Sequence, residues 1–266
     1  MIWISDPHLE FLEDSDIAAF CRTVDTRSGD SVLITGDISI APQLARSLEI
    51  LATSIRKTIY FVLGNHDRYG GSFQTVEELV AKSVRPFANL VRLTGKEIIR
   101  LSNQTALIGI DGWACATAGK GRETTIRLSD DTQIEDFRRL PNQDNRFALM
   151  LRLAQNYAAL LRPTLSTALV EYEEVILATH VPPFVGATWH EGKVSGPDFL
   201  PLFSSPTMGK MIEENAVAHL GKSIHVYCGH THSSGFYQTA NIKVWTAGAR
   251  YNHPEIQGTI QTKITA

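Results

Sequence analysis

The first 84 residues alternate short apolar runs with amphipathic helical patterns, and no other feature constrains the fold as strongly. Apolar runs over residues 2–5, 31–35 and 58–63 predict buried strands, and helical patterns follow them over 16–26, 43–55 and 76–84. Strands joined by helices of this length pair in parallel, with the helices packed on the sheet. The pattern therefore predicts an α/β fold.

Each of these three strands ends in a polar cluster. The clusters are Ser5-Asp6-Pro7-His8, Gly36-Asp37 and Gly64-Asn65-His66-Asp67. In open α/β sheets, ligands bind beyond the carboxyl ends of the strands. We therefore expect the three clusters to converge at one edge of the sheet.

The remainder of the chain predicts a second set of strands. Apolar runs indicate strands over 90–93, 98–101, 106–110, 174–178, 223–228, 235–239, 242–246 and 258–264. Residues 113–145 are polar and lack a clear period, and a helix over 146–161 should stop at Pro163. We interpret residues 1–266 as one domain with an inserted lid or connector at about 113–163. A long loop over 181–205 and a helix over 207–220, closed by Gly221, complete the pattern.

Composition narrows the class of protein. A formal net charge of -3 argues against a protein that wraps nucleic acid by electrostatic attraction. The three cysteines, Cys21, Cys115 and Cys228, are odd in number and widely spaced, which favours buried free thiols. No apolar run approaches the ~18 residues that cross a bilayer. With no secretory signal before Asp6, we expect a cytoplasmic protein without membrane contact.

Histidines and acidic residues recur at the ends of the predicted strands. After the three clusters come His180 and then Gly229-His230-Thr231-His232, and five of the nine histidines lie in these motifs. The order D-x-H, G-D, G-N-H-D, H and G-H-x-H resembles the calcineurin-like metallophosphoesterase superfamily over residues 6–232. The resemblance implies a four-layer αββα sandwich with two mixed β-sheets.

The resemblance also implies roles for individual residues. One metal ion would be held by four of them: Asp6, His8, Asp37 and His232. A second would be held by Asp37, which bridges the two ions, and by Asn65, His180 and His230. His66 would be catalytic without binding metal, and Asp67 would support it.

The residue types agree with this chemistry. Imidazole and carboxylate ligands suit manganese, iron or zinc. Two such ions would generate a metal-bridging hydroxide at neutral pH, and His66 would protonate the leaving oxygen as general acid. Two dications, less the charges of Asp6, Asp37 and hydroxide, leave a centre of roughly +1 that attracts an anionic phosphate.

We therefore expect an enzyme that hydrolyses a phosphate mono- or diester, with a nucleotide-type small molecule favoured as substrate. A metal-dependent nuclease is the first alternative, and it requires a positively charged groove that admits a strand. A non-catalytic, metal-binding protein-interaction scaffold is the second, although such members lose the histidine that this chain keeps as His66.

Some subgroups and residues fit less well. Ile38-Ser39 after the second motif and Asp67 after Gly-Asn-His disfavour protein serine/threonine phosphatases, and Ile40 stands where purple acid phosphatases carry tyrosine. For several polar or aromatic residues near the motifs a packing or solvated role is favoured: Arg68, Tyr69, Trp189, His190, Lys193, Arg250, Tyr251 and Asn252. Asp111 and Trp113 receive no role.

Overall fold

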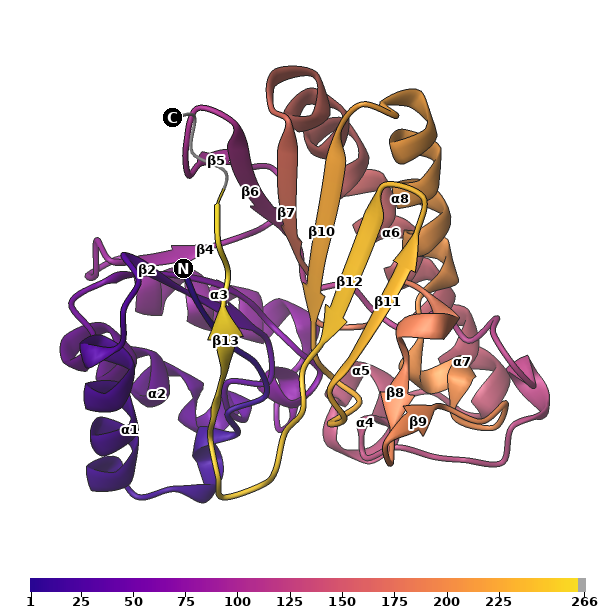
Figure 1. Ribbon diagram of the computed structural model, residues 1–266. Coiled ribbons are helices and arrows are strands. Elements are labelled where there is room, and N and C mark those ends of the chain that lie inside the picture. The colour runs from indigo at the N-terminus through magenta and orange to yellow at the C-terminus, as the bar shows by residue number, and fades with distance from the viewer. Residues whose placement is uncertain (263–266) are drawn as a thin grey trace.

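The computed structural model describes residues 1–262 and contains two β-sheets that face each other (Figure 1). The first sheet has the order β13-β1-β2-β3-β4. Its strands are β1 (Ile2–Ile4), β2 (Ser31–Thr35), β3 (Thr58–Val62), β4 (Leu90–Arg92) and β13 (Ile256–Thr259). Strands β1, β2 and β3 are parallel, as the sequence predicts, β4 joins β3 in parallel, and β13 joins β1 antiparallel.

The second sheet has the order β11-β12-β10-β7-β6-β5. Its strands are β5 (Ile99–Arg100), β6 (Thr105–Gly109), β7 (Glu174–Ala178), β10 (Ser223–Cys228), β11 (Gly235–Thr239) and β12 (Ile242–Thr246). The central strands β6, β7, β10 and β12 are parallel, and β5 and β11 are antiparallel edges. Both sheets are therefore mixed.

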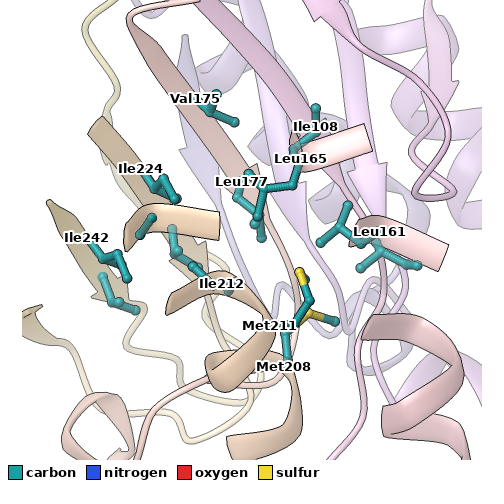
Figure 2. Close-up of a cluster of buried hydrophobic side chains, with 14 of the residues drawn as sticks. Ile108, Leu161, Leu165, Val175, Leu177, Met208, Met211, Ile212, Ile224 and Ile242 are labelled. Carbon is teal, nitrogen blue, oxygen red and sulfur yellow. The ribbon is translucent and has the colours of Figure 1, made fainter. Parts of the chain in front are cut away.

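Helices cover the outer face of each sheet. The first sheet carries α1 (Asp14–Thr26), α2 (Ala41–Ser54) and α3 (Phe73–Val84), and their apolar sides share one core with β1, β2 and β3. The second carries α6 (Gln143–Glu171) and α8 (Pro206–Ala218). Figure 2 shows Val175, Leu177 and Ile224 of this sheet beside Leu161, Leu165 and Ile212 of the two helices.

A third core lies between the sheets. Trp3, Leu33 and Val62 of the first sheet pack there against Leu107 and Ile176 of the second. Two helix layers outside two sheets make the four-layer αββα sandwich that the sequence predicts. The described cysteines are all free and buried, which confirms that prediction.

Helix α6 departs from the sequence-based prediction. It runs for 29 residues and continues through Pro163, so the prediction that this proline stops the helix is wrong. Proline costs about 3 kcal/mol inside a helix. Burial of Leu165, Ala168 and Leu169 beyond it offsets that cost, and Thr164 Oγ1 donates to Gly95 O at 2.6 Å.

Two smaller boundaries also differ. Helix α8 ends at Ala218 with His219 as its C-cap, so Gly221 is not the cap. Strand β13 begins two residues before the predicted start and ends at Thr259, while positions 263 and 264 of the predicted strand lie outside the described residues.

Residues 113–150 pack beside the carboxyl ends of the strands, in a core that Tyr69 and Val181 of the strand-end loops also join. This segment contains η3 (Gly121–Glu123), α4 (Asp130–Gln133) and α5 (Glu135–Arg138), and it lies at the lower right of Figure 1 with α7 (Leu200–Phe203), β8 (Trp189–His190) and β9 (Lys193–Val194). Trp113, Phe137 and Phe147 pack in its core with Leu202 and Phe203. Within residues 1–262, every helix is too short or too polar to span a membrane.

Candidate metal centre

The loops after β1, β2 and β10 bring four predicted ligands together. Ligand atoms of Asp6, His8, Asp37 and His232 all lie within 4.8 Å of one another. His8 Nε2 lies 3.1 Å from His232 Nε2 and 3.8 Å from Asp37 Oδ2, and His232 Nε2 lies 3.5 Å from Asp6 Oδ1. Three of the four residues are fully buried, so these groups face one another and not bulk water.

The backbone is strained at the same residues. Asp6, His8, Asp37, His230 and His232 have φ between 44° and 73°, and they are five of the nine non-glycine residues with positive φ among those described. Such conformations cost about 1–3 kcal/mol each and cluster at functional sites. The concentration of strain indicates that the fold holds these side chains in place for a purpose other than stability.

The other predicted ligands lie on the opposite side of Asp37. His180 Nε2 is 3.3 Å from Asp37 Oδ1 and 3.1 Å from Asn65 Oδ1, and His230 Nδ1 is 3.0 Å from Asn65 Oδ1. All seven predicted ligands thus lie in one cluster that Asp37 joins. Their roles as ligands stay a prediction.

Hydrogen bonds on the far side of each ring determine which nitrogen can bind metal. A backbone carbonyl only accepts, so His180 Nδ1 donates to Thr35 O at 2.9 Å and His230 Nε2 donates to Leu202 O at 3.0 Å. The opposite nitrogens, His180 Nε2 and His230 Nδ1, are therefore the ones turned toward Asn65. A hydrogen bond on the other ring nitrogen is the usual arrangement of a metal-binding histidine.

The donor set fits a cation between these groups. Asn65 Nδ2 donates to Asp130 Oδ1 at 2.8 Å and to Tyr69 Oη at 3.1 Å, which turns Asn65 Oδ1 toward His230. Burial and the neighbouring His180 lower the pKa of His230 to about 4, so its Nδ1 carries a lone pair at neutral pH. Two acceptors 3.0 Å apart repel each other unless a positive charge lies between them.

Glycines allow the loops to approach this closely. A Cβ at Gly64 would clash with the carboxylate of Asp37, and one at Gly229 would clash with Asp6. Larger residues at these positions would push the ligands apart, which explains the glycine in both motifs.

The carboxylates are ionised and require compensating charge. Burial raises the pKa of Asp6, but His232 and His180 outweigh it and lower that pKa to about 2. Burial likewise opposes ionisation of Asp37, and His180 and His66 nevertheless hold its pKa well below the usual range. Burial lowers the pKa of His180, and Asp37 and Asp6 raise it to about 10. The site therefore attracts positive charge, as protons or as metal ions.

His66 lies beside this cluster of predicted ligands and lines the adjoining cavity. Its backbone N–H donates to Asp37 Oδ1 at 2.9 Å, and its ring centroid is 4.5 Å from that of His8. Burial lowers the pKa of His66, but Asp37 and Glu10 raise it to about 9. The side chain is 17% exposed, which leaves it accessible to a bound molecule.

Two further acidic residues, Asp67 and Glu10, lie beside the predicted ligands. The buried Asp67 carboxylate accepts from the backbone N–H groups of Ser39 and Gly64, at 2.9 and 2.8 Å, so it ties two site loops together. Glu10 Oε1 lies 3.3 Å from His8 Nδ1 and 3.6 Å from His66 Nδ1. Sequence reasoning missed Glu10, although its place two residues after His8 was a signal.

Asp130 is a second residue that sequence reasoning missed. It comes from α4, and its Oδ1 accepts from Asn65 Nδ2 and from Tyr69 Oη, the latter at 2.7 Å. Its position 65 residues after Asn65 carried no motif signal.

A buried ion-pair network supports two of the ligand loops from behind. Asp111 pairs with Arg68 at 2.8 Å and with Arg92 at 2.6 Å. Its carboxylate accepts from Leu63 N at 2.7 Å, and its backbone carbonyl accepts from His180 N at 2.8 Å. The role of Arg68 and Asp111 is therefore structural.

The cluster opens into a cavity of about 310 Å³. It is lined by Asp37, Asn65, His66, Tyr69, Leu128, Ser129, His190, Phe203, His230, Thr231, His232 and Tyr251. Three loops that carry predicted ligands, the segment with α4, the 181–205 segment and the connection that carries Tyr251 all contribute to it. A volume near the lower end of the range for ligand sites suits a small molecule.

Comparison with known families identifies the chain. The family model described as calcineurin-like phosphoesterase matches residues 1–234. The chain belongs to this family. This phosphoesterase is accordingly a metal-dependent phosphoric ester hydrolase, and its family works with a dinuclear metal centre.

Solved structures share the fold of this phosphoesterase at low sequence identity. The phosphopantetheinyl hydrolase of Mycobacterium tuberculosis superposes with a TM-score of 0.65 at 13% identity, covering 93% of this chain and 88% of that one. A dimetal phosphatase of Danio rerio gives 0.57 at 12% identity, covering 93% and 86%. GAP50, described as the anchor in the inner membrane complex of Plasmodium, gives 0.54 at 12% identity, covering 98% and 75%. A search of curated proteins found no match.

Proposed function

We propose that this phosphoesterase hydrolyses a phosphate mono- or diester of a small, nucleotide-type alcohol, with His66 as general acid. The observation that carries the proposal is the convergence of Asp6, His8, Asp37 and His232 beside a small cavity that His66 also lines.

The seven clustered residues would hold two divalent ions. Asp6, His8 and His232 would hold one, and Asn65, His180 and His230 the other, with one oxygen of Asp37 facing each set. Imidazole with carboxylate and amide oxygen suits manganese, iron or zinc. Bound there, two such ions would activate the attacking water and stabilise the phosphoryl oxygens.

His66 would act on the leaving group. Water, having lost a proton to solvent, would add to phosphorus as the bond from phosphorus to the alcohol oxygen breaks, and His66 would give its proton to that oxygen. The products would be the free alcohol and either phosphate, from a monoester, or a phosphate monoester, from a diester, and His66 would regain a proton from solvent. Glu10, 3.6 Å from His66 Nδ1, would favour the protonated ring.

We also propose that the inserted segment at about 113–163 closes one side of the site. Leu128 and Ser129 line the cavity, and Asp130 holds Asn65. This wall supports a small substrate over a nucleic acid strand, which would need an open, basic groove.

A panel of metals and substrates tests the proposal. The purified protein, loaded in turn with Mn²⁺, Fe²⁺ or Zn²⁺, should hydrolyse aryl or nucleotide mono- or diesters. Activity on DNA or RNA alone would favour a nuclease, and a metal-loaded protein inactive on every ester would favour a scaffold.

Variants separate chemistry from metal binding. His66→Ala should keep its metal content and lose about 10²–10⁴ in kcat. Asp37→Ala should lose one or both ions by elemental analysis. His219→Ala, at the end of α8 and outside the cluster, should change neither. Full activity of His66→Ala would remove this residue from the mechanism.

A further inference from the structure

Two partly exposed aromatic side chains lie next to the cluster of predicted metal ligands. Phe11 is 49% exposed and Tyr251 is 45% exposed. Phe11 ends η1 (Leu9–Phe11), which directly follows His8, and Tyr251 lies in the connection between β12 and β13. Their ring centroids are 5.1 Å apart and the rings meet at 67°, so they form the two walls of a corner. We call this pair the aromatic corner.

The aromatic corner starts at the ligands and reaches solvent. The Tyr251 ring centroid lies 4.7 Å from that of His8, 5.2 Å from that of His232 and 6.2 Å from that of His66. Tyr251 also lines the catalytic cavity. A molecule whose phosphate lies at the cluster, with its leaving oxygen near His66, would therefore extend its alcohol portion along this corner.

The connection that carries Tyr251 is held in place. Arg250 forms an ion pair with Glu255, His253 N donates to Arg250 O at 3.1 Å, and Gln257 Oε1 accepts from Gly248 N at 3.0 Å. The next residue, Asn252, has a φ of 65°, a left-handed conformation that defines the turn. The ring of Tyr251 is thus presented by an ordered turn, and a substrate need not order it.

Exposed aromatic rings beside a phosphate-binding site suit a phosphate ester that carries a planar ring. Phe11 and Tyr251 pack against each other and against His8, and each residue still has about half of its surface exposed. A planar ring can stack on one wall of the corner and direct its edge at the other, the two arrangements that aromatic pairs prefer. A sugar or alkyl chain can bury apolar surface there but lacks this stacking geometry.

We propose that the aromatic corner binds the planar ring of the leaving alcohol, so that the substrate is the phosphate ester of a nucleoside or a similar aromatic alcohol. This assignment rests on the proposed function and narrows it to one substrate class. The phosphate would lie at the cluster of predicted metal ligands, and the base would lie against Phe11 and Tyr251.

Matched substrates test the assignment. A nucleoside 5′-phosphate and ribose 5-phosphate release the same type of primary alcohol and differ only in the base. Each is supplied as the monoester and as its methyl diester to the Mn²⁺-loaded enzyme. Stacking on an aromatic side chain predicts that kcat/KM favours the nucleotide by roughly tenfold or more, chiefly through KM.

Variants locate the effect. Tyr251→Ala and Phe11→Ala should bring the ratio of the two kcat/KM values toward one by raising the KM of the nucleotide, and Tyr251→Phe should keep the ratio. Phe236→Ala removes an equally exposed ring, 47% exposed on β11 and outside the site, and should leave the ratio at the wild-type value.

Two results would overturn the assignment. The first is a wild-type ratio near one, and the second is a ratio that Tyr251→Ala and Phe11→Ala leave intact. If the wild-type enzyme hydrolyses neither substrate, nor p-nitrophenyl phosphate or its diester, the proposed function itself fails. Hydrolysis of p-nitrophenyl esters without preference for a base rejects only the aromatic corner.

Discussion

Removal of the Asp130 side chain should weaken the binding of one metal ion without unfolding the protein. Asp130 Oδ1 accepts from Asn65 Nδ2 at 2.8 Å and from Tyr69 Oη at 2.7 Å, and both residues are buried. In Asp130→Ala the Asn65 amide loses this acceptor and can rotate, which would turn Nδ2 toward a bound cation. Only the ion near His180 and His230 depends on this amide.

The size of the effect follows from the lost bond. A buried donor that loses its acceptor costs about 1–3 kcal/mol. Loss of a partner that orients a metal ligand reduces metal affinity by about 10–100-fold, which is ~1.4–2.7 kcal/mol. The cost of the lost hydrogen bond and the expected loss of metal-binding free energy therefore agree in size. Asp130→Asn keeps an oxygen acceptor for Asn65 and should lose less.

Calorimetric titration with Mn²⁺ and elemental analysis after dialysis measure the effect. Wild-type protein should bind two ions, and Asp130→Ala should bind one tightly and one about 10–100-fold more weakly. Asp131→Ala is the matched control because Asp131 lies next along α4 and pairs with Arg127 at 2.9 Å. Wild-type affinity for both ions in Asp130→Ala would refute the argument, and an equal loss in Asp131→Ala would attribute it to damage to the helix.

Three further predictions concern other parts of the molecule. Burial lowers the pKa of His66, whereas the carboxylates of Asp37 and Glu10 raise it. Glu10→Gln removes one of these carboxylates, so the alkaline limb of the kcat/KM profile should move to lower pH. An alkaline limb at the wild-type pH would exclude Glu10 from this role. Burial raises the pKa of Asp111, but Arg92 and Arg68 lower it overall, so its stabilising contribution is complete above the unfolded pKa of about 3.9 and disappears as the pH falls through the folded value. Asp111→Asn should therefore cost about 3–5 kcal/mol in urea unfolding at pH 7, and the gap to wild type should narrow below pH 4; a constant gap would contradict the ion-pair account. Ile176→Ala, fully buried between the sheets, should cost about 2–5 kcal/mol, whereas Val170→Ala, 68% exposed on α6, should stay within about 0.5 kcal/mol.

Patterns within short stretches of chain predicted much of the fold. Strands β2, β7, β10, β11 and β12 have the bounds that their apolar runs indicate. The helix that passes Pro163 was not predictable in this way, since burial against the second sheet outweighs a local rule. The end of α8 also differs from the prediction, since the helix is capped at His219, two residues before Gly221.

The candidate site divides along the same line. The motifs named the residues that now lie around Asp37. Parallel strand order brings Asp6, Asp37 and Asn65 to one edge of the first sheet. His180, His230 and His232 follow strands of the second sheet and reach Asp37 only because the two sheets pack face to face. The motifs could not name Asp130 or Glu10 as partners of Asn65 and His66. Nor could they place the Asp67 carboxylate on backbone amides.

The sequence by itself determined the class of fold, the family and the group of residues that gathers around Asp37. Hydrophobic periodicity and the spacing within each motif are properties of residues close together in the chain, so they can be recognised without knowing how the layers pack. The tertiary structure alone decided which nitrogen of His180 and of His230 faces Asn65, which carboxylates orient the ligands and where aromatic rings remain exposed. These features depend on contacts between residues far apart in the chain, such as Asn65 with Asp130 and His8 with Tyr251, and such contacts exist only after the layers have packed.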